Sequence, residues 1–102
     1  MDPGIPDNVM ISDVVVSTAG RDRGQWFYVI KEEPMFLYLA NGKDRTLERP
    51  KLKKRKHIEK VLRSETRVAQ KLQAGDKVLN GELRRDLAGI GRDMQSNNPG
   101  GF

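Results

Sequence analysis

The stretch VVVSTAGRDRGQWFYV, residues 14–29, decides the fold. Valine and aromatic residues favour β-strands, so its two ends predict strands at residues 11–17 and 25–31. Glycine adopts positive φ without steric cost, so Gly20 and Gly24 can close the two ends of a connecting loop. The apolar run that follows Gly24 is unbroken, which predicts that both faces of the second strand are covered.

The two glycines do not form a phosphate-binding loop of the nucleotide-binding kind. Such loops need G-x-G-x-x-G or G-x-x-x-x-G-K-[ST] spacing and lead into a helix. Here Gly20 and Gly24 are four residues apart and the next element is a strand. We therefore interpret residues 20–24 as a hairpin connection, with Arg21 and Arg23 either solvated or part of a binding surface.

The rest of the chain extends this β pattern and then becomes helical. Residues 35–40 alternate as a third strand, Asn41-Gly42 is typical of a type I′ hairpin turn, and residues 43–48 are predicted as a polar fourth strand near an edge. A helix over residues 58–72 is left open because Glu65 interrupts its apolar stripe. The helix predicted with more support runs from Asn80 as N-cap to a stop at Gly91.

The positive charge is concentrated in one segment. Residues 1–48 carry a net charge of −3, residues 49–71 carry +8 and residues 72–102 are neutral. Six of the eight residues at 49–56 are Lys or Arg. Such a segment is expected to be mobile without a partner and to bind a polyanion, although a solvated linker is the alternative.

Catalysis, metal binding and membrane insertion have no support in the sequence. The chain has no cysteine and a single histidine, His57, so we expect no metal or other cofactor. No serine or threonine stands at a motif spacing from that histidine, so we expect no enzyme and no small-molecule substrate. No apolar run approaches the roughly 20 residues that cross a bilayer, and no signal peptide is evident. We expect a cytoplasmic protein.

Residues 12–58 resemble the KOW motif of ribosomal and transcription proteins. The match lies in Val14–Val29, where Ala-Gly-Arg is followed by a glycine and an apolar strand, and in Lys56-His57-Ile58. Arg45 and Pro50-Lys51 are similar to small bacterial relatives of the archaeal- and eukaryotic-type large-subunit ribosomal proteins.

The resemblance implies a mainly β fold, a small SH3-like antiparallel β-barrel that binds RNA, commonly ribosomal RNA. We expect a flexible leader at 1–10, the β domain with its basic run at 11–58, a helical extension packing on the barrel at 59–94 and a disordered tail at 95–102. The alternative is a protein-interaction module of the translation or transcription machinery. The candidate RNA-binding residues are Arg21, Arg23, Arg45, Arg49, Lys51, Lys53, Lys54, Arg55, Lys56 and His57.

The aromatic residues of the second and third strands have two interpretations. Trp26, Tyr28, Phe36 and Tyr38 are spaced as a sheet face that the apolar stripe of the C-terminal helix covers. They are also residue types on which unpaired bases stack. Packing against the helix is the favoured interpretation.

Overall fold

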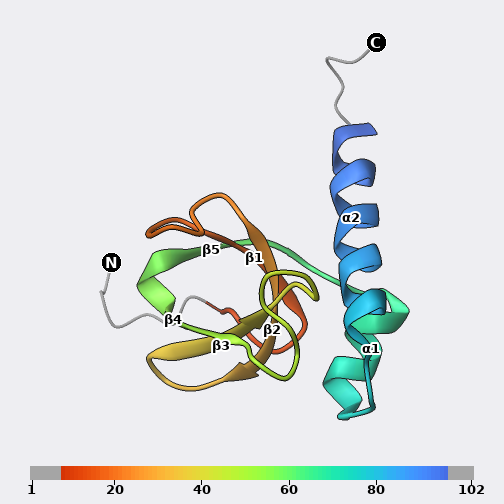
Figure 1. The fold of residues 1–102 in the computed structure, drawn as a ribbon, viewed down its shortest axis with the longest axis horizontal. Coiled ribbons are helices and arrows are strands. Elements are labelled where there is room, and N and C mark those ends of the chain that lie inside the picture. Colours follow the sequence, from red (N-terminus) through yellow and green to blue (C-terminus); the bar gives the residue numbers. More distant parts are fainter. Residues whose placement is uncertain (1–7, 97–102) are drawn as a thin grey trace.

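The computed structural model describes residues 8–96, which form one curved antiparallel sheet and two helices (Figure 1). The elements are β1 Asp13–Ser17, β2 Trp26–Glu32, β3 Phe36–Ala40, β4 Lys51–Lys54, the 3₁₀ turn η1 Arg55–His57, β5 Ile58–Arg63, α1 Arg67–Ala74 and α2 Asn80–Ser96. The sheet order is β4-β3-β2-β1-β5, so β4 and β5 are its two edges and the sheet is open between them. The turn η1 joins these edge strands.

Alternation along the central strands creates two cores, one on each face of the sheet. Successive side chains of a strand point to opposite faces, so neighbouring residues enter different cores. On the concave face, Val15, Phe27 and Val29 pack with Leu37, Leu39, Ile58 and Val9. On the other face, Val14 and Tyr28 pack with residues of α1 and α2, including Leu83, Leu87 and Ile90. The prediction that both faces of the second strand are covered is confirmed.

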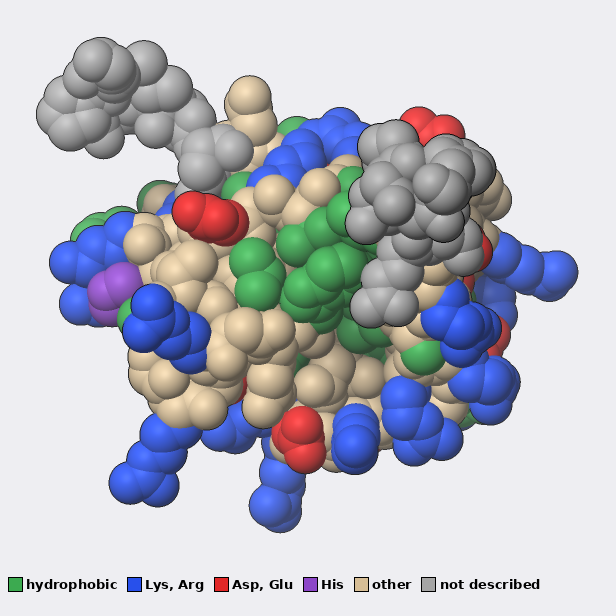
Figure 2. All heavy atoms as spheres, turned by 90° about the horizontal axis from the view of Figure 1, so that it is seen from above, with side chains coloured by type: hydrophobic (Ala, Val, Ile, Leu, Met, Phe, Trp, Pro, Cys, Tyr) green, Lys and Arg blue, Asp and Glu red, His purple; other side chains and the backbone are tan. Residues whose placement is uncertain are grey.

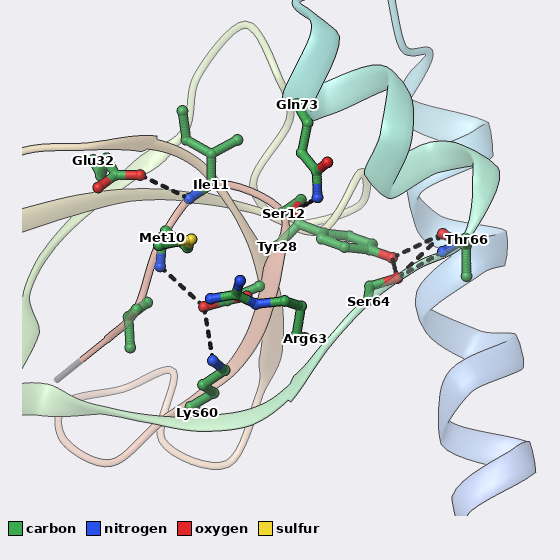
Figure 3. Close-up of polar contacts among 12 residues, drawn as sticks. Met10, Ile11, Ser12, Tyr28, Glu32, Lys60, Arg63, Ser64, Thr66 and Gln73 are labelled. Atoms are coloured by element: carbon green, nitrogen blue, oxygen red, sulfur yellow. Dashed lines mark hydrogen bonds and ion pairs between the residues drawn. The ribbon is translucent and has the colours of Figure 1, made fainter.

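A buried polar cluster links the helices to the sheet. The Tyr28 hydroxyl lies 2.7 Å from the Ser64 hydroxyl, at the passage from β5 to α1 (Figure 3), and also contacts the Asp86 carboxylate of α2. Thr66 donates to the same carboxylate at 2.8 Å. Burial and the contact with Asp86 together raise the pKa of Tyr28 to about 12, so it stays protonated and able to donate.

The predicted fourth strand at residues 43–48 is wrong, and so is the two-residue turn at Asn41-Gly42. Residues 41–50 form a loop that rests on the start of α2, and the fourth strand lies at 51–54. The Asn41 side chain accepts hydrogen bonds from the backbone of Lys43 and Arg45 instead of entering a type I′ turn. Asn80 does not act as a predicted N-cap either, because its side chain holds this loop through the Leu47 amide and Glu48.

Residues 58–63 form strand β5, although the sequence is compatible with a helix there. Ile58 is buried in the concave core. The strand pairs with β1, so its backbone hydrogen bonds are made to a neighbouring strand and not within a helix. Helix α1 begins only after Thr66, whose hydroxyl accepts a hydrogen bond from the Ala69 amide.

The predicted ends of the domain and of the last helix also shift. Val9 falls in the predicted leader but is buried among core residues, and residues 1–7 lie outside the described part of the chain. Helix α2 passes through Gly91 to Ser96, because Gly91 does not adopt the positive φ of a helix stop. The predicted tail therefore overlaps the helix at residues 95–96, and residues 97–102 lie outside the described range.

Gly42 and Gly24 have similar backbone conformations, but we expect alanine to be tolerated much better at Gly24 than at Gly42. Gly42 and Gly24 have φ of 77° and 89°. A Cβ at Gly42 would lie 2.2 Å from the Asn80 carbonyl oxygen, whereas a Cβ at Gly24 meets nothing within 4 Å. Gly42→Ala should therefore cost about 3 kcal/mol or more of unfolding free energy, and Gly24→Ala only about 1–2 kcal/mol. Urea unfolding followed by Trp26 fluorescence measures both, and equal losses would contradict the placement of the loop on α2.

Candidate nucleic-acid interface

The loop between β1 and β2 is held to the edge strand β4 by a buried ion pair. Lys53 Nζ lies 2.6 Å from Asp22 Oδ1 and donates a second hydrogen bond, also 2.6 Å, to the Ala19 carbonyl oxygen. The Lys53 and Asp22 side chains are only 8% and 14% exposed. Ser17 donates to the same carboxylate oxygen at 2.6 Å. Positive φ at both glycines of the loop lets the chain return over β4.

The electrostatics of Asp22 follow from this arrangement. Burial acts to raise its pKa, but the hydrogen bonds from Lys53 and Ser17, together with the charges of Lys53 and Lys51, lower the pKa below its usual value. The charged partner of Asp22 is Lys53 on another strand, not one of the two neighbouring arginines. Arg21 and Arg23 are left exposed on the outside of the loop.

Several other cations of the basic segment also stabilise the fold. Arg55 donates to the carbonyl oxygens of Glu33 and Val9, at 2.9 and 3.0 Å. Lys60 and Arg63 both lie 3.3 Å from the buried Asp13 carboxylate (Figure 3). Lys53 and Arg55 therefore already have partners inside the fold. The basic run, which the sequence predicts to be mobile, is regular in the structure. It forms a strand and a 3₁₀ turn with internal partners.

The remaining cations of the run lie on the surface around the β4 edge. Lys54 and Lys56 are exposed and Lys51 is half-buried, and none of the three forms an ion pair within residues 8–96. In Figure 2, Lys and Arg side chains and the histidine lie at the end of the molecule that carries η1 in Figure 1, and further Lys and Arg side chains line the lower rim and the opposite end. The two neighbouring arginines of the β1–β2 loop extend this cationic surface.

A shallow hollow of about 380 Å³ opens at this edge. The start of the β1–β2 loop, the first residue of β3, strand β4 and the end of η1 all contribute to its walls. His57 is placed there by a hydrogen bond from the Thr18 amide to its carbonyl oxygen, at 2.9 Å. The lining residues are Ala19, Gly20, Phe36, Lys51, Leu52, Lys53, Lys54 and His57.

Six of the ten predicted residues do not line the hollow, namely Arg21, Arg23, Arg45, Arg49, Arg55 and Lys56. Arg45 and Arg49 are exposed on the loop between β3 and β4, and neither lines the hollow. The Arg45 backbone closes this loop by accepting hydrogen bonds from the Asn41 and Gly42 amides. Arg49 is two residues before β4 and is the closer of the two, in sequence, to the cationic edge.

Phe36 is one of the four aromatic residues for which the sequence leaves two interpretations, packing against the helix and stacking of unpaired bases. The favoured interpretation holds for Trp26 and Tyr28, which pack in the cluster covered by the helices. Phe36 and Tyr38 lie further along the sheet, belong to neither core and are half-buried. Their position two residues apart on one strand was the available signal, but the extent of helix cover could not be inferred from it.

Neither grouped metal ligands nor a membrane-spanning helix occurs in the described range. Residues 8–96 contain no group of three carboxylate or histidine side chains arranged to hold a metal ion. No helix within that range is long and apolar enough to cross a bilayer. No protein-family model matches the sequence, and comparison with curated proteins finds no match.

Substitution of Lys53 should reduce the free energy of unfolding much more than substitution of its neighbour Lys54. Lys53→Met should lose several kcal/mol of unfolding free energy, because it leaves the Asp22 carboxylate buried without its partner. Lys54→Met should change stability by less than about 0.5 kcal/mol, since Lys54 is exposed. Denaturant unfolding of the two variants measures the difference. A Lys53→Met protein as stable as wild type would contradict the assigned role of the ion pair.

The lowered pKa of Asp22 also predicts a pH dependence. The folded protein binds the Asp22 proton more weakly than the unfolded chain, so this contribution is present above about pH 4 and is lost as the pH falls through the folded-state value. Asp22→Asn should therefore be less stable than wild type at neutral pH, with the gap narrowing in acid. Thermal melts across this pH range test this prediction, which a constant gap would contradict.

Proposed function

We propose that this protein binds RNA through the cationic edge formed by β4, η1 and the β1–β2 loop, on an SH3-like barrel of the KOW type. The small, curved antiparallel sheet of five strands agrees with the fold that the KOW resemblance implies. RNA, and ribosomal RNA in particular, is the ligand class that the resemblance implies.

The observation that carries the proposal is the uncompensated charge at the β4 edge. No acidic residue occurs between Arg49 and His57, and the nearest loop carboxylate, Asp22, is already neutralised by Lys53. The exposed cations Arg21, Arg23, Lys54 and Lys56 therefore add to one another. Such a surface attracts a polyanion, because each neutralised phosphate releases a condensed counterion.

This binding mode is non-catalytic and positions the protein on the nucleic-acid backbone. Phosphate contacts supply affinity and orientation without reading sequence. The fold favours such contacts because β4 is a regular strand paired with β3, so the backbone positions of its lysines are fixed. A backbone that is ordered in the free protein reduces the entropy lost on binding.

A protein-interaction module remains the second candidate, and a specific surface favours it. A hollow of about 330 Å³ lies between β5 and α2. Leu62, Ile90 and Met94 line it together with polar and charged residues, Arg63, Ser64, Glu65, Thr66 and Asp93. Figure 2 shows an apolar patch in the middle of the face seen from above. Copurification after nuclease treatment separates the candidates, since a protein partner held at this hollow would survive digestion of RNA.

Removing three surface lysines should weaken RNA binding and flatten its salt dependence. The variant Lys51→Gln, Lys54→Gln, Lys56→Gln loses up to three phosphate contacts, which lowers the slope of log K against log salt by about 2 for single-stranded RNA. Fluorescence anisotropy at several salt concentrations measures the slope.

A charge-matched control removes three cations elsewhere on the surface. Lys43→Gln, Lys77→Gln, Arg92→Gln has the same net charge as the first variant, and all three positions are exposed. It should retain most of the wild-type affinity and slope. If the control weakens binding as much as the first variant, the β4 edge is not the RNA-binding surface.

A further inference from the structure

Among the five aromatic residues of β2 and β3, four have a ring that already has a partner, and one of these is Phe27 in the concave core. Trp26 and Tyr28 pack in the cluster covered by the helices. The Lys31 ammonium stands over the Tyr38 ring, 5.1 Å from its centroid, which is the geometry of a cation–π contact. Phe36 differs from these, because its side chain lines the hollow at the β4 edge.

The hollow combines the apolar side chains of Phe36 and Leu52 with the cations Lys51 and Lys54, which we call its rim. Leu52, on the neighbouring strand, is 48% exposed and lines the same hollow, and Met35 is 67% exposed. Lys54 is the direct cross-strand partner of Phe36, so their Cβ atoms are roughly 5 Å apart. Lys51 lines the hollow from the start of β4.

This combination fits one part of a nucleic acid better than any other. A base offers a flat apolar face to an aromatic ring, and its phosphates lie within reach of cations at the rim. In a duplex the faces of the bases are buried in the stack, so only an unpaired nucleotide can use such a hollow. The His57 side chain and the backbone of residues 19–20 add polar groups to the wall.

We propose that the hollow holds one unpaired base stacked on Phe36, with the flanking phosphates bound by Lys51 and Lys54. The proposal rests on the RNA-binding function proposed above and narrows its ligand to RNA with single-stranded segments. The charge of the rim supplies attraction to any RNA, and the Phe36 ring supplies the preference for an unpaired nucleotide.

The test compares two probes on wild type and variants. A short labelled oligouridylate presents unpaired bases, and a blunt RNA duplex with the same number of phosphates presents none. Phe36→Leu, which keeps the site apolar but removes the aromatic face, should weaken oligouridylate binding about tenfold and leave duplex binding unchanged. Phe36→Trp should restore tight binding, and Leu79→Ala, at an exposed apolar residue on the α1–α2 connection, should have no effect.

A spectroscopic readout reports stacking directly. A base stacked on an indole quenches its fluorescence, so oligouridylate should quench Phe36→Trp well beyond the change seen in wild type, where Trp26 alone emits. The duplex should not produce this quenching. Thermal melting of each variant shows whether a loss of binding reflects a loss of folding, and Phe36→Trp provides a second variant should Phe36→Leu unfold.

The outcomes separate this proposal from the function on which it rests. If wild type binds neither probe, the RNA-binding function fails. If wild type binds RNA but Phe36→Leu binds both probes with unchanged affinity, or loses both equally while folded, the stacking proposal is overturned and phosphate binding stands. Absence of extra quenching in a Phe36→Trp protein that binds oligouridylate would overturn it as well.

Discussion

The ion pair between Lys53 and Asp22 is the interaction on which the rest of this surface depends. It joins the β1–β2 loop to the edge strand β4. Positive φ at Gly20 and Gly24 allows the loop to fold back, and the lysines of β4 would repel one another without such a partner. Breaking a buried pair of this kind leaves an uncompensated charge, which is more costly than never having formed it. The pair therefore makes the order of β4 and the conformation of residues 20–24 mutually dependent.

Strand alternation then sorts the cations of the basic run into two roles. Lys53 faces inward and forms an ion pair with Asp22 of the β1–β2 loop, whereas Lys54 faces outward beside Phe36. Arg55 turns back to two carbonyl oxygens at the start of η1. A cationic surface therefore remains at Lys51, Lys54 and Lys56, while the internal partners of Lys53 and Arg55 hold the segment in a regular conformation.

The sequence predicted the strands that carry strong periodicity and missed what depends on distant partners. The first three strands, the glycine-closed loop and the packing of the last helix on Tyr28 follow from local residue types. The strand at 51–54 was missed because its lysines look solvated until Asp22 is brought alongside. Among candidate RNA contacts, Lys53 and Arg55 were indistinguishable from Lys54 by charge. The sequence also could not separate Phe36 and Tyr38 from the helix-covered Trp26 and Tyr28, because helix cover is a tertiary property.

The most direct measurement is an NMR titration of backbone amides with single-stranded RNA. The account predicts shift changes concentrated at residues 19–24, at Phe36 and at 51–57, with little change in α2. Changes centred instead on Leu62, Ile90 and Met94 would contradict it, because they would place the ligand in the hollow between β5 and α2.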